Sequence, residues 1–350
     1  MTIELIERIR AAAASKTPLC IQGGGSKHWY GQQPQGELLS TRGYSGIIDY
    51  DPTELVITAR CGTPLSEITA ALAAQQQFLA FEPPSFSPDA TIGGVVAAGL
   101  AGPRRAYAGG VRDFVLGAVL VDGHAERLKF GGQVMKNVAG YDVSRMLAGS
   151  MGSLGLLLEL SIKVLPLPRS EITLVFECDQ AKALQLCNQW AGMPLPLSAS
   201  SWHQGLLHLR LSGSEAATSA AQRQLGGITP DPDSAQQHWQ SLREQTHAFF
   251  NTSVWRLSLP ATTSALELRG QQLIEWGGAQ RWLVDSDLDA ASMRKKITAL
   301  GGHATLFKLG DKQQGVFQPL PAPLMHIHQR LKTAFDPASI FNPGRLYPAL

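Results

Sequence analysis

The chain has 350 residues, which exceeds the usual size of one domain and predicts two domains or one large α/β domain with an insertion. Its hydrophobic content of 44% and charged content of 17% are typical of a soluble globular protein, and a formal net charge of +2 gives no support for nucleic acid or an anionic membrane as a partner. The amino-terminal segment has neither the basic start nor the apolar core of a secretion signal, and no stretch is long and apolar enough to span a bilayer. We therefore expect a protein that is neither secreted nor inserted in a membrane.

Helices, strands and turns alternate in the first half of the chain with few clean βαβ repeats. Helices are predicted at Ile3–Ala14 and Pro64–Gln77, and strands at Pro18–Gln22, Gly46–Tyr50, Leu55–Arg60, Phe114–Val121, Ala125–Phe130 and Leu156–Leu165. The segment Leu165–Ser170 carries two prolines, which interrupt helices and central strands, so we place a domain boundary there. The pattern favours an α+β arrangement.

The second half alternates strand and helix, which predicts a small antiparallel sheet with helices on one face. Strands are predicted at Glu171–Glu177, Gly205–Leu211, Ser253–Leu259, Gln280–Val284 and Ala304–Lys308, and helices at Gln180–Trp190, Ser214–Leu225, Leu288–Leu300 and Ala322–Ala334. Asp231–Phe250 is interpreted as a polar stretch without an assigned element. The last predicted helix leads into the sequence FDPASIFNPGRLYP.

The four cysteines have no CxxC spacing, which argues against an iron–sulfur or zinc site in this chain. We interpret them as buried free thiols of a protein in a reducing compartment. They are Cys20, Cys61, Cys178 and Cys187.

The first motif is QGGGSK at Gln22–Lys27, directly after a short apolar strand. Consecutive glycines expose backbone N–H groups to an anion, while Ser26 adds a hydroxyl and Lys27 a positive charge, as a pyrophosphate would need. A Rossmann fingerprint would need a glycine in place of His28, and the P-loop pattern GxxxxGK[ST] is absent from the sequence. From this loop alone, a flexible turn and a phosphate site are both open.

The second motif lies in the glycine-rich stretch Thr91–Gly155, which begins TIGGVVAAGLAGPRRAYAGGVRD. We interpret this stretch as backbone laid against a large, flat ligand, with a run of tight turns as the alternative. The arginines Arg104, Arg105 and Arg112 could place positive charge near phosphates or a developing anion, although solvated surface arginines are equally consistent with the pattern.

The motifs QGGGSK, TIGGVVAAG, RRAYAGGVRDFVLG, KNVAGYDVSRMLAGSMGSLG and FDPASIFNPGRL occur in this order. Together they resemble the flavin-binding domain of the vanillyl-alcohol oxidase superfamily, the PCMH-type FAD-binding fold. More closely, the chain resembles the short E-subunit branch of that family, found in bacterial glycolate dehydrogenases, also called glycolate oxidases. The resemblance implies a PCMH-type domain of two α+β subdomains at 1–168, a reduced substrate or cap domain at 169–320, and a segment at 321–350 that returns to the FAD domain.

The resemblance also implies residues that hold FAD. They are Gly23, Gly24, Gly25, Ser26, Lys27, Thr91, Ile92, Gly93, Gly94, Gly99, Arg112, Asp113, Gly149, Ser150, Gly152, Ser153, Leu154 and Gly155, and the last run is preceded by Lys136, Asn137, Gly140, Tyr141 and Asp142, as in the family's KNxxGYD. Because His28 lies two residues past the usual place of a flavin-linking histidine, we expect FAD to be bound without a covalent bond.

The chain departs from the catalytic members of the family because it lacks their HxGDGNxH motif. Its nearest counterpart, GGHATLFK, keeps His303 as a candidate base, while Arg104, Arg105 and Arg345 are candidate grips for a substrate carboxylate. His326 and His328 face different directions on a predicted helix and are a poor metal pair. No metal site is expected.

The resemblance implies a function within a complex. The chain would be an FAD-binding subunit that works with a larger FAD-binding subunit and an iron–sulfur subunit, oxidises glycolate to glyoxylate and passes electrons towards quinone. It would be cytoplasmic, at the inner face of the inner membrane through that complex. Two alternatives remain open: a stand-alone FAD dehydrogenase of another small 2-hydroxy acid, and a non-catalytic assembly subunit that has lost flavin.

Overall fold

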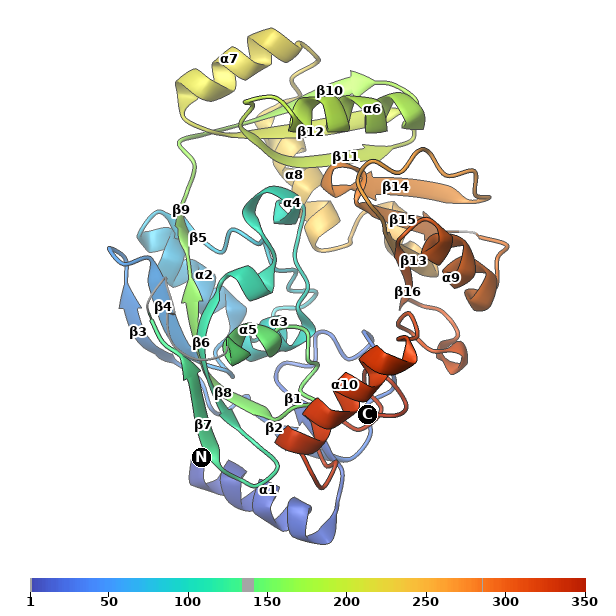
Figure 1. The fold of residues 1–350 in the computed structure, drawn as a ribbon. Coiled ribbons are helices and arrows are strands. Elements are labelled where there is room, and N and C mark those ends of the chain that lie inside the picture. The colour runs from blue at the N-terminus through green and yellow to red at the C-terminus, as the bar shows by residue number, and fades with distance from the viewer. Residues whose placement is uncertain (1, 134–141, 285) are drawn as a thin grey trace. The chain divides into compact units, whose positions relative to one another are not determined.

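The computed structural model describes residues 2–133, 142–284 and 286–350, and the chain divides into two compact units (Figure 1). The first unit runs to Leu100 and also contains Gly110–Pro166 and Pro319–Leu350. The second unit consists of Ala101–Gly109 and Leu167–Gln318. Residues 101–109, which the sequence-based division placed in the first domain, therefore belong to the second unit.

The first unit contains a five-stranded antiparallel sheet in the order β3-β4-β8-β6-β7 (Figure 1). Its strands are β3 (Ile47–Asp51), β4 (Val56–Arg60), β6 (Val115–Val121), β7 (Arg127–Gly131) and β8 (Leu156–Lys163). Every residue of β6 is buried, which agrees with its unbroken apolar sequence VLGAVLV. The shorter elements of this unit are α2 (Leu65–Ala74), β5 (Gln77–Phe78), α3 (Ile92–Ala98), η1 (Val111–Asp113), α5 (Val143–Met146), β9 (Leu165–Pro166) and α10 (Ala322–Phe335).

A second layer of the first unit combines α1 (Thr2–Ser15) with the parallel pair β1 (Leu19–Gln22) and β2 (Glu37–Ser40). Apolar residues of α1, β1 and β2 share one core with β6 and β8. Phe341, near the carboxyl end, is fully buried in this core, so the end of the chain packs beside its beginning. The backbone confirms this proximity, because Leu19 N donates to the carbonyl of Ile340 at 2.7 Å.

The second unit contains a seven-stranded antiparallel sheet in the order β10-β12-β11-β14-β15-β13-β16. Its strands are β10 (Ser170–Glu177), β11 (Leu197–His203), β12 (Leu206–Gly213), β13 (Val254–Ser258), β14 (Gln271–Glu275), β15 (Gln280–Val284) and β16 (His303–Lys308). Its helices are α4 (Arg105–Ala108), α6 (Gln180–Ala191), α7 (Glu215–Leu225), α8 (Pro232–Arg243) and α9 (Ala290–Ala299), with single turns η2 (Ala248–Asn251), η3 (Trp276–Gly278) and η4 (Lys312–Gln314). The predicted α+β class with an antiparallel second sheet is confirmed.

The helices of the second unit cover both faces of its sheet, which corrects the expectation that they lie on one face. Helices α6, α7 and α9 pack on the face that carries Leu209 and Leu257. Helix α8 packs on the opposite face, where Trp239 donates to Thr173 Oγ1 at 2.9 Å and lies under Arg210. The sequence analysis assigned no element to this segment because it is mostly polar; the buried residues of α8 are Trp239 and Leu242.

None of the described helices combines the length and the apolar character that crossing a bilayer requires.

Candidate functional site

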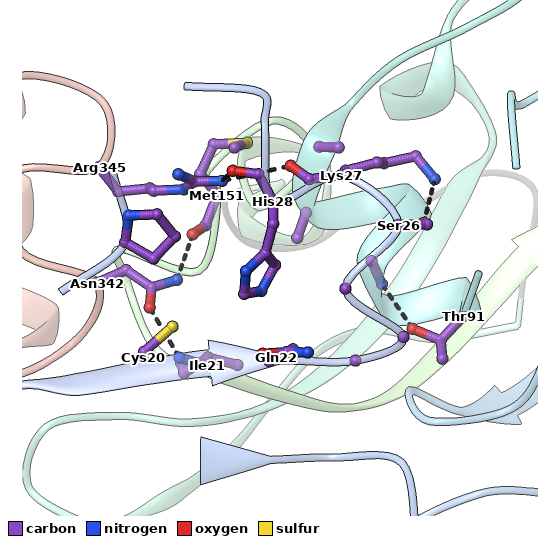
Figure 2. Close-up of a pocket in the computed structure, with 17 residues that line it drawn as sticks. Cys20, Ile21, Gln22, Ser26, Lys27, His28, Thr91, Met151, Asn342 and Arg345 are labelled. Carbon is purple, nitrogen blue, oxygen red and sulfur yellow. Dashed lines mark hydrogen bonds between the residues drawn. The ribbon is translucent and has the colours of Figure 1, made fainter. Parts of the chain in front are cut away.

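A pocket in the first unit is built by four segments that are distant in sequence (Figure 2). They are the end of β1 with the following glycine loop, α3 with its cap Thr91, the turn that contains Met151, and the carboxyl-terminal segment. The pocket is open to solvent, and its empty space of about 560 Å³ includes part of that solvent. Its lining residues are Cys20, Ile21, Gln22, Gly23, Gly24, Gly25, Ser26, Lys27, His28, Pro34, Thr91, Gly94, Ala97, Ala98, Met151, Asn342 and Arg345.

A second hollow of about 390 Å³ adjoins the pocket and shares six of its lining residues, so the two form one elongated surface. The shared residues are Ile21, Gly23, Gly94, Ala97, Met151 and Asn342. The surface continues past Gly93, Gly152 and Gly155. A continuous surface with a glycine loop at one part suits a long ligand that has both an anionic and a flat portion.

The glycine loop presents backbone donors that the chain itself leaves unused. Within the described part of the chain, the N–H groups of Gly23, Gly24, Gly25 and Ser26 form no hydrogen bond. A Cβ on Gly24 would lie 1.5 Å from the carbonyl oxygen of Asp89, and Gly25 has φ of +74°, so both positions require glycine. Successive unengaged amide groups in a glycine turn form a concavity for an anion, so the loop fits the diphosphate of a dinucleotide.

The TIGGVVAAG motif forms α3, a helix for which the sequence analysis assigned no element. Thr91 caps α3 by accepting a hydrogen bond from Gly94 N at 3.2 Å. A Cβ on Gly93 would lie 2.7 Å from Cys61, whereas a Cβ on Gly94 would have one neighbour within 4 Å, Thr91 Oγ1 at 3.3 Å. Gly93 is therefore required by the packing of the helix, and Gly94 leaves the pocket wall open.

The run Gly149–Gly155 packs against α3. Gly149 N donates to the carbonyl of Val96 at 2.9 Å, and Met151 N donates to that of Ala97 at 2.9 Å. Gly99 ends α3 with φ of +65°, and a Cβ there would lie 2.9 Å from the Cα of Gly149. Several glycines of this stretch therefore serve the protein's own close packing, and the predicted ligand contact applies to a smaller set.

The carboxyl-terminal FNPGR sequence joins the two sides of the pocket. Asn342 Oδ1 accepts from Ile21 N at 2.8 Å, and its Nδ2 donates to the carbonyl of Met151 at 2.6 Å. A buried ion pair supports this segment, because Lys332 Nζ lies 2.7 Å from Asp336 Oδ2 and also donates to the carbonyl of Ser153 at 2.8 Å. Sequence reasoning used FNPGR to recognise the family and did not identify Asn342 as a pocket residue.

Arg345 lines the pocket and is 5% exposed. Its guanidinium donates to the carbonyls of Lys27 at 3.3 Å and His28 at 3.0 Å, and also to that of Gln32. Burial lowers the pKa of Arg345 to about 10, so the side chain is a cation at neutral pH. The guanidinium therefore bonds to the loop that follows the glycines.

Two further pocket residues carry titratable groups. Figure 2 shows the imidazole of His28 pointing into the pocket, and burial together with the charge of Arg345 lowers the pKa of that ring. Lys27 has its ammonium 3.2 Å from Ser26 Oγ and 3.3 Å from the carbonyl of Ser85, above the ring of Phe86. Its charge therefore stays beside the loop.

The predicted FAD residues fall into two groups. Those that line the pocket or the adjoining hollow are Gly23, Gly24, Gly25, Ser26, Lys27, Thr91, Gly93, Gly94, Gly152 and Gly155. Those that do not are Ile92, Gly99, Arg112, Asp113, Gly149, Ser150, Ser153 and Leu154. Arg112 is exposed, with its Nε 3.8 Å from Asp113 Oδ1, and Ser153 Oγ donates to the carbonyl of Ser150 at 2.7 Å. Lys136, Asn137, Gly140 and Tyr141 lie outside the described residues, while Asp142 caps α5.

The other catalytic candidates belong to the second unit. Arg104 is buried, with its Nη2 2.5 Å from Glu171 Oε2. Burial raises the pKa of Glu171, but Arg210 and Arg104 outweigh this effect and leave it below its ordinary value. His303 begins β16 with an exposed side chain. Among the residues that the structure describes, no group of three or more histidine, cysteine, aspartate or glutamate side chains could hold a metal ion.

Comparisons with known proteins also indicate that the first unit binds a dinucleotide, FAD. A sequence model of the FAD binding domain family matches residues 2–131. Over 97% of this chain the fold superposes on alkyldihydroxyacetonephosphate synthase, with a TM-score of 0.67, 14% identity and coverage of 74% of that chain. The fold and the site define an FAD-binding protein with the PCMH-type fold.

Sequence relatives define the branch. Glycolate oxidase subunit GlcE of Escherichia coli (strain K12) is 49% identical over 348 residues, which cover 99% of this chain and 97% of that protein. The chain belongs to the GlcE family. D-lactate dehydrogenase of Anaerostipes hadrus is 34% identical over 140 residues, 40% of this chain and 29% of that protein. Glycolate oxidase subunit GlcD of Bacillus subtilis (strain 168) is 28% identical over 176 residues, 50% of this chain and 37% of that protein.

Proposed function

We propose that this chain is the FAD-binding subunit of a multi-subunit glycolate dehydrogenase (glycolate oxidase) that oxidises glycolate to glyoxylate. The observation that carries the proposal is the 49% identity to a glycolate oxidase subunit over 99% of the chain. The pocket supports it, because its open glycine loop and helix wall suit the cofactor that such an oxidation needs.

In this proposal FAD supplies the two-electron acceptor for the carbon–hydrogen bond of the hydroxy acid. The amide groups of Gly23–Ser26 hold the diphosphate, and Gly94 keeps the wall of α3 flat where the cofactor lies against it. Asn342 fixes the strand and the loop on either side of the pocket. We expect no covalent link to the protein, so the flavin should leave the chain on denaturation.

The complex that we propose contains a larger FAD-binding subunit and an iron–sulfur subunit, which carry electrons towards quinone. The similarity to GlcD supports the presence of a second flavoprotein in the complex. GlcD is a different glycolate oxidase subunit, and its sequence is similar to that of half of this chain. We place the assembly in the cytoplasm, at the inner face of the inner membrane through its partners.

A second candidate function is a stand-alone dehydrogenase for another small 2-hydroxy acid. The similarity to a D-lactate dehydrogenase over 140 residues favours it. In that case Arg104 or His303 would contribute to substrate turnover by the isolated chain. The third possibility, an assembly subunit without flavin, predicts a fold that is stable but does not retain FAD.

One experiment separates the proposal from the stand-alone dehydrogenase. The chain is purified alone and after co-expression with the larger flavoprotein and the iron–sulfur subunit, and reduction of an artificial electron acceptor is followed with glycolate and with D-lactate. The proposal predicts glycolate-dependent turnover by the complex and loss of that turnover when this subunit is omitted. Full turnover by the larger flavoprotein without this chain would contradict it, and turnover of D-lactate by this chain alone would favour the second candidate.

A further inference from the structure

Arg345 is a buried cation that has no acidic partner within the described part of the chain. A buried charge is costly unless an opposite charge or several hydrogen bonds compensate it. Here the compensation comes from the carbonyls of Lys27, His28 and Gln32, which carry only partial negative charge. The positive charge is therefore held in place and left electrostatically unneutralised.

The three carbonyls belong to the segment that directly follows the glycine loop. Because His28 N also donates to the carbonyl of Gly25 at 3.1 Å, fixing His28 fixes the turn that carries the unused amide groups. A guanidinium has five N–H donors, and these bonds leave the Nε–H and one Nη1–H group without an acceptor among the described residues. Arg345 thus braces the loop and retains donors at the pocket (Figure 2).

The charge of Arg345 acts on the pocket itself. It lowers the pKa of the His28 imidazole and opposes the effect of burial on the Cys20 thiol, and both side chains line the pocket. Other buried arginines brace loops in a similar way: Arg294 in the second unit donates to the carbonyls of Gln314 and Gly315 at 2.7 and 2.6 Å. Arg345 differs because it lines the pocket that the unused amide groups of the glycine loop also line.

We propose that Arg345 is the electrostatic anchor and positioning residue for the FAD diphosphate. It sets the conformation of the glycine loop through three carbonyls, and it supplies the cation that the bound diphosphate neutralises. The inference rests on FAD binding in this pocket and not on the identity of the substrate.

The test uses the full chain freed of flavin, with FAD and riboflavin as probes and fluorescence quenching as the readout. Riboflavin has the ring and lacks phosphate. We expect Arg345→Gln to raise the Kd for FAD at least about 30-fold and to change the Kd for riboflavin less than about threefold. In Arg345→Gln the Kd for FAD should also rise less steeply with salt concentration than in the wild type.

Arg345→Lys keeps the positive charge and loses the planar, forked guanidinium. Its Kd for FAD should therefore lie between that of the wild type and that of Arg345→Gln. Arg294→Gln is the matched control, because it removes a buried loop brace from the other unit and should leave FAD affinity unchanged. If Arg345→Gln binds FAD as tightly as the wild type, or loses FAD and riboflavin equally, the proposal is wrong. Neither readout depends on glycolate, so a failure of the proposed function would be seen separately.

An NMR titration of His28 gives an independent test that needs no unstable variant. In the flavin-free wild type the pKa of His28 should lie below its ordinary value, because burial and the Arg345 cation both disfavour protonation. FAD should raise this pKa as the diphosphate neutralises the cation, while riboflavin should not. An unchanged His28 pKa in saturating FAD would overturn the placement of the diphosphate beside Arg345.

Discussion

Replacing Gly94 with alanine should separate cofactor binding from folding. Gly94 lines the pocket and the adjoining hollow, and an added Cβ would have one neighbour within 4 Å, Thr91 Oγ1 at 3.3 Å. Glycine to alanine in a helix is stabilising by roughly 0.5–1 kcal/mol, and the close contact with Thr91 offsets part of that gain. We therefore expect the flavin-free Gly94→Ala variant to unfold at a temperature close to that of the wild type.

The same methyl group would occupy space that bound FAD needs. Forcing an extra methyl into a filled site costs about 1–3 kcal/mol, which corresponds to a Kd for FAD raised about 5- to 150-fold. The measurement is a fluorescence titration of the flavin-free chain, combined with thermal unfolding of the same preparation.

Gly93→Ala is the matched control one residue earlier on α3. Its Cβ would lie 2.7 Å from both the Cβ and the carbonyl oxygen of Cys61, so this variant should lose about 1–3 kcal/mol of stability before any ligand is added. A Gly94→Ala chain that folds and binds FAD with wild-type affinity would refute the assignment of this wall to the cofactor.

Two further predictions concern the stability of each unit. Asp336→Asn should destabilise the first unit by about 3–5 kcal/mol in urea unfolding, because it leaves Lys332 as a buried charge, and a wild-type midpoint would contradict the role of this pair. In the second unit the rings of His208 and His238 are stacked, with their centroids 3.8 Å apart. Burial lowers the pKa of His208 to about 4 and that of His238 to about 3. The neighbouring charges of His247 and Arg210 also lower the pKa of His238. Because the unfolded chain binds these protons near pH 6.5 and the folded chain does not, the contribution of the pair to stability is complete above that pH and is lost as the pH falls towards 4. Thermal unfolding followed from pH 8 to pH 4 should show this loss, and His238→Gln should reduce its slope.

The elements with clear local patterns were predictable from the sequence. The range of β15 agrees with its prediction, and α6 ends one residue beyond it. Strand β11 was missed because LSASSWH is polar for a buried strand, and its serines are accommodated by hydrogen bonds such as that between Ser201 and His238 at 2.8 Å. Helix α3 was missed because its paired glycines lower helix propensity, while tertiary packing against Cys61 and Gly149 overrides that preference.

The glycine loop of the candidate site was predictable from the sequence, whereas the carboxyl-terminal segment that completes the pocket was not. The consecutive glycines at 23–25 and their neighbour Ser26 form part of the pocket, as the motif indicated. Asn342 contacts Ile21 across 321 positions in the chain, and no local pattern reports such a contact. We expected Arg345 to bind a carboxylate because its guanidinium is a cation. The partners that the structure shows are backbone carbonyls, and a sequence does not indicate which backbone groups lie near a side chain.

The flavin content of the chain purified alone tests the central claim most directly. The visible absorption spectrum is recorded, the protein is precipitated with acid, and FAD is measured in the supernatant and in the pellet. We predict about one FAD per chain, all of it released to the supernatant. A folded chain that contains no flavin and takes up none from added FAD would contradict the account, and flavin retained in the pellet would contradict its non-covalent binding.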